Sequence, residues 1–216
     1  MTPATAMRPG ILLVGGGGHC RSVIDVLEAA AIPVAGVVDR AGRDIGDVLG
    51  YPVLGTDDDL PRLVRDHPFA LVTIGQIETP GPRKRLAVRL KALGFVLPTL
   101  VSPQARVSRH ATIGEGTVVH HFAVINAGAR VGANCIINTR ALIEHDVVVG
   151  DFCHISTAAV VNGGASVGDG TFCGSGVLCR DNTAIGANCF VAMGELVVRP
   201  LSPGRRLPPH LRKDHP

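Results

Sequence analysis

Hydrophobic and polar positions in the second half of the chain repeat with a period of six residues. From Val101 to Val197, every sixth residue is Val, Ile or Cys through seventeen consecutive positions, and the residue four places further on is mostly small. A period of six is neither the 3.6 of an amphipathic helix nor the two of a single strand. It is typical of a parallel β-helix, in which each hexad forms one short side of a coil. We therefore predict an uninterrupted β-helix over residues 99–198.

The first half has a different pattern, in which short apolar runs alternate with amphipathic segments. It predicts three strands and two helices: strands over Ile11–Val14, Val34–Val38 and Ala70–Ile74, and helices over Ser22–Ala29 and Pro82–Leu93. Alternating strands and helices are typical of a parallel α/β sheet. The region is too short for two mononucleotide-binding halves. We predict a Rossmann-like half domain over residues 11–98 that holds one nucleotide diphosphate, which suits a nucleotide-sugar better than NAD.

A glycine turn follows the first predicted strand. Gly15–Gly18 and His19 stand between strand and helix, an order that places backbone N–H groups against a phosphate. Cys20 occupies the place of the third glycine in the usual dinucleotide fingerprint, so a tight turn without a ligand is the alternative. Asp39 ends the second strand about 20 residues further on, where an acidic residue commonly meets a ribose or base. The context favours phosphate binding.

Composition and charge narrow the class of protein. The formal net charge of +3 and the absence of one long basic run argue against nucleic acid. Residues 1–10 read as an N-terminal extension without the features of a signal peptide, and no stretch approaches the ~20 apolar residues of a membrane span. Five of the six cysteines fall on hexad positions, without CxxC spacing. We expect a cytoplasmic protein without metal, with residues 199–216 as a solvated tail.

Chemistry has to come from polar residues on the outside of the β-helix, because the hexad core is apolar. His145 stands out, since Glu144 and Asp146 flank it. A carboxylate beside an imidazole can fix its tautomer and raise its basicity, as a general base requires. His154 lies nine residues on, half a coil away, so the two histidines cannot be vertical neighbours in one chain. They could still line one cleft across a subunit boundary.

Together, the glycine turn, the hexad repeat and the segment Asn138–Ser156 (NTRALIEHDVVVGDFCHIS) resemble a known family. It is that of the bacterial nucleotide-sugar acetyltransferases, which include the sialic acid O-acetyltransferase-like proteins and the N-acetyltransferases of bacillosamine and perosamine synthesis. The resemblance runs from Ile11 to about Val198. It implies a left-handed β-helix, a homotrimer and acetyl-CoA as co-substrate without a metal. Within the family, the chain looks most like the GDP-perosamine N-acetyltransferases.

The resemblance also assigns roles to residues. It implies that His145 is the catalytic base and that Asp146 orients it. It places acetyl-CoA contacts at His154, Gly163, Ser175 and Met193. It places contacts with the nucleotide-sugar at Gly17, Gly18, His19, Asp39, Arg40, Gly75 and Asn138. Two departures are visible: Asp146 replaces the Glu of some members, and the usual G-[VN]-P-A-[KR] ending is missing.

The function expected from these features is transfer of acetyl from acetyl-CoA to the amine of a nucleotide-linked amino-dideoxy sugar. His145 would take the proton and a backbone N–H near Gly163 would hold the oxyanion. Three alternatives stay open. A sialic acid-type O-acetyltransferase shares every motif, a zinc-dependent carbonic anhydrase needs three converging histidines, and a non-catalytic nucleotide-sugar sensor does not need His145 beside Asp146.

Overall fold

The computed structural model describes residues 10–42 and 46–209. The expectations for residues 1–9 and for the end of the tail, residues 210–216, lie outside this range. The chain divides into two compact units. One unit contains the described residues up to Gly75 together with Arg85–Pro98, and the other contains Gln76–Lys84 together with the residues from Thr99 onward. The short segment Gln76–Lys84 is therefore packed with the C-terminal unit.

The N-terminal unit is built on a four-stranded parallel sheet in the order β3-β2-β1-β4. Its elements are β1 (Ile11–Val14), α1 (Gly18–Ala29), β2 (Val34–Asp39), β3 (Val53–Thr56), a 3-10 turn (Asp57–Asp59), α2 (Leu60–Leu63) and β4 (Ala70–Val72). Helix α3 (Gly81–Ala92) starts in the segment Gln76–Lys84 and continues into this unit. The strands and helices that the sequence predicts are present. β3 and α2 escaped prediction because they are four residues long, and β3 is only half-buried.

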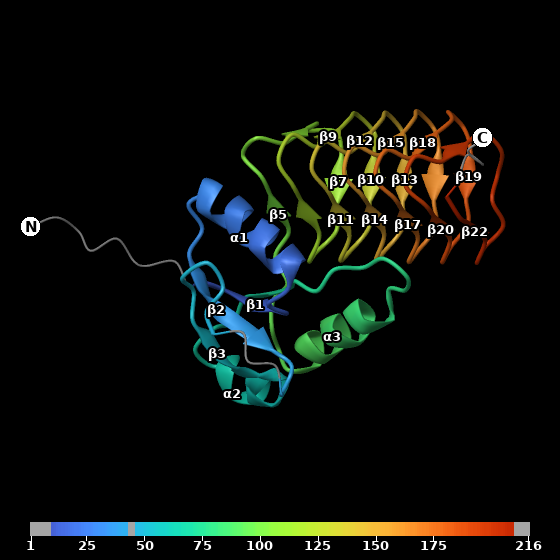
Figure 1. Ribbon diagram of the computed structural model, residues 1–216. Helices are drawn as coiled ribbons and strands as arrows, with labels where there is room; N and C mark the ends of the chain where they lie inside the picture. Colours follow the sequence, from blue (N-terminus) through green and yellow to red (C-terminus); the bar gives the residue numbers. More distant parts are fainter. Residues whose placement is uncertain (1–9, 43–45, 210–216) are drawn as a thin grey trace, which may run out of the picture. The chain divides into compact units, whose positions relative to one another are not determined.

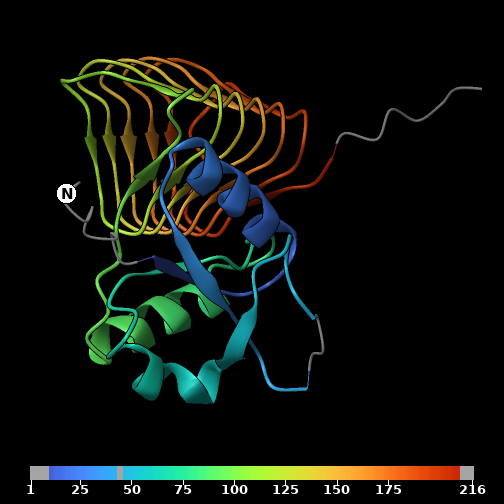
Figure 2. The same ribbon diagram turned by 90° about the vertical axis from the view of Figure 1, so that its left-hand side faces the viewer.

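The C-terminal unit is a left-handed parallel β-helix with three faces. Figures 1 and 2 show its coils stacked along one axis, with short strands repeated at each level. The seven-stranded face holds β5 (Leu100–Val101), β8 (Val118–Val119), β11 (Ile136–Ile137), β14 (His154–Ile155), β17 (Phe172–Cys173), β20 (Phe190–Val191) and β22 (Arg206–Leu207). The six-stranded face holds β6 (Arg106–Val107), β9 (Val124–Ile125), β12 (Leu142–Ile143), β15 (Val160–Val161), β18 (Leu178–Cys179) and β21 (Leu196–Val197). The five-stranded face holds β7 (Thr112–Ile113), β10 (Arg130–Val131), β13 (Val148–Val149), β16 (Ser166–Val167) and β19 (Ala184–Ile185).

The hexad residues form the core of this unit, as predicted. From Val119 to Val197 every hexad residue is at most 4% exposed, and the small residues four places on, such as Ala141 and Cys153, are buried beside them. Strands recur every six residues from β5 to β21, and no long loop interrupts them. All six cysteines are buried and free. Stacked β-branched side chains and small corner residues therefore account for the β-helix.

Between residues 116 and 194, each corner of the β-helix is a tight turn whose second residue has a left-handed backbone. Such residues recur every six positions and include Gly128, Asp146 (φ 60°), Gly164 and Asn182 (φ 50°). Gly, Asn and Asp tolerate this conformation best. Residues at equivalent corners of successive coils are eighteen apart, because a coil contains three hexads. A residue at a corner therefore lies directly between the residue eighteen positions before it and the residue eighteen positions after it.

The described part of the tail differs from a solvated extension. Leu201 pairs with Ile185, and β22 pairs with β20 through Leu207 and Val191. These partners are sixteen residues apart, whereas the earlier coils pair at eighteen. The last coil is two residues shorter than the others, so its apolar residues do not fall on hexad positions. The hexad pattern of the sequence therefore does not reveal this coil.

Candidate active site

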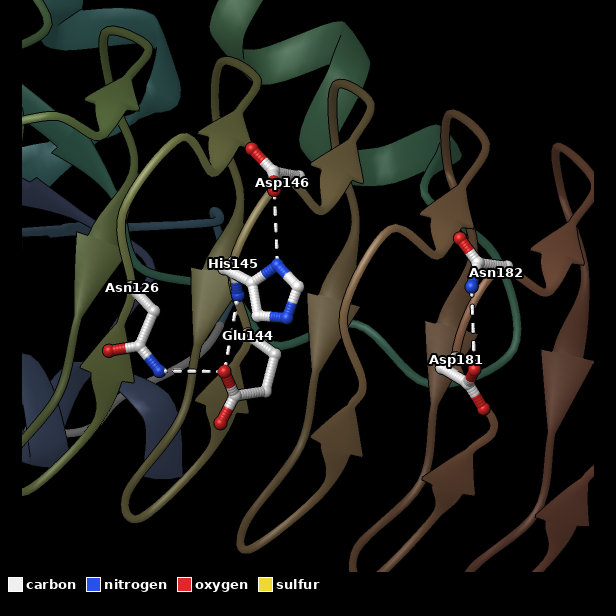
Figure 3. A network of polar contacts seen from close by, with 6 residues as sticks. All are labelled: Asn126, Glu144, His145, Asp146, Asp181 and Asn182. Atoms are coloured by element: carbon white, nitrogen blue, oxygen red, sulfur yellow. Dashed lines mark hydrogen bonds and ion pairs between the residues drawn. The ribbon is translucent and has the colours of Figure 1, made fainter.

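His145 lies at the corner between the six-stranded and the five-stranded face, in the turn that joins β12 to β13. Its imidazole Nδ1 is 3.0 Å from Oδ2 of Asp146. An ionised carboxylate only accepts hydrogen bonds, so Nδ1 carries a proton, and in the neutral ring Nε2 keeps a lone pair. The left-handed backbone of Asp146 turns its carboxylate toward the preceding residue. Figure 3 shows the pair, with Nε2 on the side of the ring away from Asp146.

Glu144 stabilises the same turn through its side chain. Its Oε2 accepts hydrogen bonds from Asn126 Nδ2 (2.9 Å) and from the backbone N–H of His145 (3.2 Å) (Figure 3). The side chains of His145 and Asp146 are 65% and 72% exposed. The base candidate is thus oriented by hydrogen bonds while its ring remains open to a ligand.

Gly163 and Gly164 lie one coil further on and leave the next layer of the corner without side chains. A Cβ on Gly163 would lie 2.5 Å from His145 Nε2, so the ring extends over this glycine. The neighbouring N–H groups of Asn162 and Gly164 donate to carbonyl oxygens, whereas that of Gly163 has no partner within the described chain. It is available to an oxyanion formed close to His145 Nε2.

The missing side chains create a depression of about 540 Å³ at this corner. Its lining residues are Glu144, His145, Asp146, Asn162, Gly163, Gly164, Asp181 and Asn182. Three of them carry carboxylates, and none is Lys or Arg. The depression therefore favours a cationic or neutral ligand over an anion.

A second candidate site lies at the carboxyl ends of the strands in the N-terminal sheet. Strand order reverses between β1 and β4, and ligands of open α/β sheets bind at such a point. Gly15 has φ +112° and packs against Ile74, so it serves the turn itself. In contrast, a Cβ on Gly17 or Gly18 would meet nothing within 4 Å. The space at the start of α1 is open to a phosphate.

Asp39 and Gly75 border this edge of the sheet. Asp39 is 7% exposed, and its Oδ2 accepts a hydrogen bond from the N–H of Gly16 (3.3 Å). A Cβ on Gly75, which follows β4, would be 3.9 Å from His19 Cβ. Asp39 and Arg40 also line a depression of about 510 Å³ together with residues of β3. Cys20 is buried in α1, and burial raises its thiol pKa to about 11, so the thiol stays neutral.

His154 is buried on the outer side of the seven-stranded face. Its Nδ1 is 2.6 Å from the backbone oxygen of Gln76, and Nε2 is 3.5 Å from Asn138 Nδ2. Burial lowers the pKa of this imidazole to about 4, so the ring is neutral near pH 7. The predicted contact between His154 and acetyl-CoA remains a prediction.

Comparison with known proteins gave two matching family models. Residues 10–90 match the PglD N-terminal domain, and residues 110–145 match the bacterial transferase hexapeptide model of six repeats. A crystal structure of perosamine N-acetyltransferase from Caulobacter crescentus, in complex with CoA and GDP-perosamine, is 36% identical over 91% of this chain and 92% of its own, with a TM-score of 0.86. The chain belongs to the nucleotide-sugar acetyltransferases of the hexapeptide family.

Other comparisons agree with this assignment. The acetyltransferase domain of PglB from Neisseria gonorrhoeae, solved with acetyl coenzyme A, is 31% identical over 92% of this chain and 95% of its own, with a TM-score of 0.85. WeeI from Acinetobacter baumannii, at 21% identity over 94% of this chain and 97% of its own, has the same fold with a TM-score of 0.83. No curated protein matched the sequence. The family resemblance and the enzyme class read from the sequence are confirmed.

One chain of this acetyltransferase does not bring all the expected site residues together. His145, Asp146 and Gly163 share one corner. Ser175, whose hydroxyl is 3.1 Å from that of Ser156, and Met193, which is 68% exposed, lie at the corner between the seven-stranded and the six-stranded face. Their contacts with acetyl-CoA stay predictions.

Sequence reasoning missed several residues around the candidate site. Asp181 and Asn182 line the depression, and Asn126 holds Glu144. Counting in steps of eighteen from His145 leads to Gly163 and then to Asp181, so the coil length was a usable signal. Over residues 10–42 and 46–209, no cluster of three or more His, Cys, Asp or Glu side chains is arranged to bind a metal ion. In the same ranges, no helix has the length and apolarity needed to cross a membrane.

Proposed function

We propose that this acetyltransferase moves acetyl from acetyl-CoA to the amino group of a nucleotide-linked amino-dideoxy sugar, with GDP-perosamine as the first candidate. The observation that carries the proposal is the hydrogen-bonded pair of His145 and Asp146. Nε2 of His145 lies over Gly163, and the chain matches a family of transferases. The relative from Caulobacter crescentus, with GDP-perosamine bound, supports the choice of sugar.

The proposed reaction is a direct transfer within a ternary complex. The amine nitrogen attacks the thioester carbonyl carbon while His145 Nε2 takes the proton from the nitrogen. The Gly163 N–H donates to the oxyanion of the tetrahedral intermediate. The C–S bond then breaks, the amide forms, and the CoA thiolate leaves and receives a proton. Asp146 holds the imidazole in the required tautomer and stabilises the imidazolium.

The lining of the depression favours an amino sugar over a sialic acid. Glu144, Asp146 and Asp181 contribute three carboxylates without a compensating Lys or Arg. A sialic acid carries its own carboxylate and would meet like charges there, whereas an amine or its ammonium form is attracted. This charge pattern supports N-acetylation over the O-acetyltransferase alternative.

The test is an acetyl-transfer assay with acetyl-CoA and a panel of GDP-, UDP- and dTDP-linked amino sugars. Free CoA thiol is released with each turnover, and mass spectrometry identifies the acetylated acceptor. We expect GDP-perosamine to have the highest kcat/KM of the panel. Transfer only to a sialic acid hydroxyl would select the O-acetyltransferase, and binding of nucleotide-sugars without thiol release would select the sensor.

Gly17 offers a test of where the nucleotide-sugar binds. Its φ of −81° suits any residue, and a Cβ there would meet no atom within 4 Å, so Gly17→Val should fold normally. The added methyl groups would occupy the space proposed for the phosphate. We expect KM for the nucleotide-sugar to rise about tenfold or more, with KM for acetyl-CoA nearly unchanged, in steady-state kinetics. Equal changes in both constants, or none, would reject the proposed division between sites.

We also propose that the enzyme is a homotrimer whose active site lies between neighbouring copies. The outward positions of the six-stranded face form an aliphatic stripe: Val124, Leu142, Val160, Leu178 and Leu196. Leu178 and Leu196 are 42% and 62% exposed in one chain. Such a contiguous apolar surface is typical of an interface. The stripe lies between the corner of His145 and that of Met193, so a second copy packed on it would help to complete the site.

Leu178→Asp tests this interface. Burying a leucine is worth about 1.5–3 kcal/mol, and an aspartate placed in an apolar interface adds a desolvation cost. Light scattering should give the wild type about three times the 22.4 kDa of one chain, and the variant a smaller mass with little activity. Val88→Asp replaces an exposed valine on α3 and should keep the wild-type mass. An unchanged mass for Leu178→Asp would contradict the stripe as the interface.

We propose that the enzyme works in the cytoplasm, which is consistent with six buried, free cysteines. Burial raises the thiol pKa of several of them, including that of Cys179 to about 11, so they act as small apolar side chains. We propose no partner among nucleic acids or membranes.

A further inference from the structure

The mechanism leaves the buried ring of His154 without a function. The ring packs edge-on against Phe172, with 5.2 Å between ring centroids, and the residue is 9% exposed. A backbone carbonyl only accepts hydrogen bonds, so the 2.6 Å contact with Gln76 O means that Nδ1 carries the proton. Nε2 then has a lone pair and cannot donate to a thioester oxygen. A contact of this ring with acetyl-CoA would therefore have to accept a hydrogen bond.

The bond to Gln76 holds the start of a segment that packs on the β-helix. The Gln76 side chain also donates to the backbone oxygen of Phe152 (2.9 Å). Glu78, further along the segment, contacts Arg206 in the last coil (2.7 Å). Arg83 donates a hydrogen bond to the backbone oxygen of Asn134 (3.1 Å). The Lys84 ammonium lies over the Phe152 ring, 5.4 Å from its centroid. The segment Gln76–Lys84 is thus fixed along its length, and His154 fixes its first residue.

Gln76 is also the residue next to the proposed nucleotide-sugar edge. It follows Gly75 directly, and Gly75 lies beside His19. Gln76 is 3% exposed, and its Oε1 is buried without a hydrogen-bond partner among the described residues. A buried acceptor left unpaired costs stability, and such costs in native structures call for an explanation. Together, these contacts indicate that the position of Gln76 serves the neighbouring nucleotide-sugar edge as well as the stability of the fold.

We propose that His154 is a positioning residue for the nucleotide-sugar. Through the Nδ1–H bond to Gln76 O, it holds the turn at Gly75 in the form that binds the substrate. This inference rests on the proposed function, because it takes the edge at Gly75 as the nucleotide-sugar site. It assigns the role to Nδ1, whereas the contact with acetyl-CoA that the family resemblance implies would use Nε2.

Two substitutions separate the two nitrogens. The amide nitrogen of asparagine can take the place of Nδ1, and that of glutamine can take the place of Nε2. We expect His154→Asn to keep KM for the nucleotide-sugar within about threefold of the wild type. His154→Gln should raise it about tenfold, the size of one lost buried hydrogen bond, with KM for acetyl-CoA unchanged. Gln76→Ala, added to His154→Gln, should cost less than it does alone, because both act on one contact network.

The opposite order of the two variants, or a change confined to KM for acetyl-CoA, would overturn the proposal. Calorimetric titration with GDP, UDP and dTDP measures the same effect without turnover, and coenzyme A serves as the reference ligand. If no amino sugar is acetylated but His154→Gln still weakens nucleoside diphosphate binding about tenfold, the proposed function fails and the role of His154 stands. If the wild type binds none of the three nucleotides, the role of His154 fails as well.

Discussion

Replacing His145 with asparagine is expected to lower kcat by about 10²–10⁴-fold, the usual contribution of a general base. The ring is hydrogen-bonded to Asp146 through Nδ1, so the lost group is the Nε2 lone pair over Gly163. KM for both substrates should change little, because a base acts mainly in the transition state. Steady-state kinetics with thiol release as the readout measures all three constants.

The fold should survive this substitution, since the His145 side chain is 65% exposed and contributes no core packing. Circular dichroism and the oligomeric mass provide the control. Asp146→Asn keeps the shape of the partner and should lower kcat by a smaller factor, because the base remains while its orienting charge is lost. Nearly normal turnover in His145→Asn would remove the residue from the mechanism, and His154 or the substrate itself would become the candidate base.

Gly163→Ala is expected to lower kcat by about 10²-fold although it removes no catalytic side chain. The new methyl group would lie 2.5 Å from His145 Nε2 and 2.6 Å from Cε1, so the ring has to move. Because the ring is exposed, it can rotate away at little cost to stability, and the base then leaves its position. A displacement of about 1 Å in an active site can cost 10²-fold in rate. Thermal unfolding should give nearly the wild-type Tm.

The double variant of Gly163→Ala and His145→Asn distinguishes displacement of the base from damage to the oxyanion site. If the methyl acts by moving His145, then Gly163→Ala should cost nothing further in a His145→Asn background. If it acts on the Gly163 N–H, the two losses should multiply. Wild-type turnover in Gly163→Ala would show that the ring and the glycine are not in contact during the reaction.

The sequence alone was enough to predict the β-helix. A buried aliphatic residue is needed at every sixth position, because each short strand contributes one inward side chain to a narrow core. A small residue is needed four places on, because the corners leave little room. These are local requirements that repeat at each level, so a periodic pattern records them. The strand–glycine–helix order at the start of the chain is local in the same sense, and β1 and α1 were predictable from it.

The tertiary structure decided which of the predicted site residues meet. The pairing of His145 with Asp146 was visible in the sequence, but the layer cleared by Gly163 and Gly164, and Asp181 beyond it, depend on the stacking of coils. The last coil escaped the pattern because its strands pair at an offset of sixteen residues. The burial of His154 was not predictable, because nothing local shows that a segment 78 residues earlier covers it. Contacts between residues distant in the chain leave no period in the sequence, so only the fold reveals them.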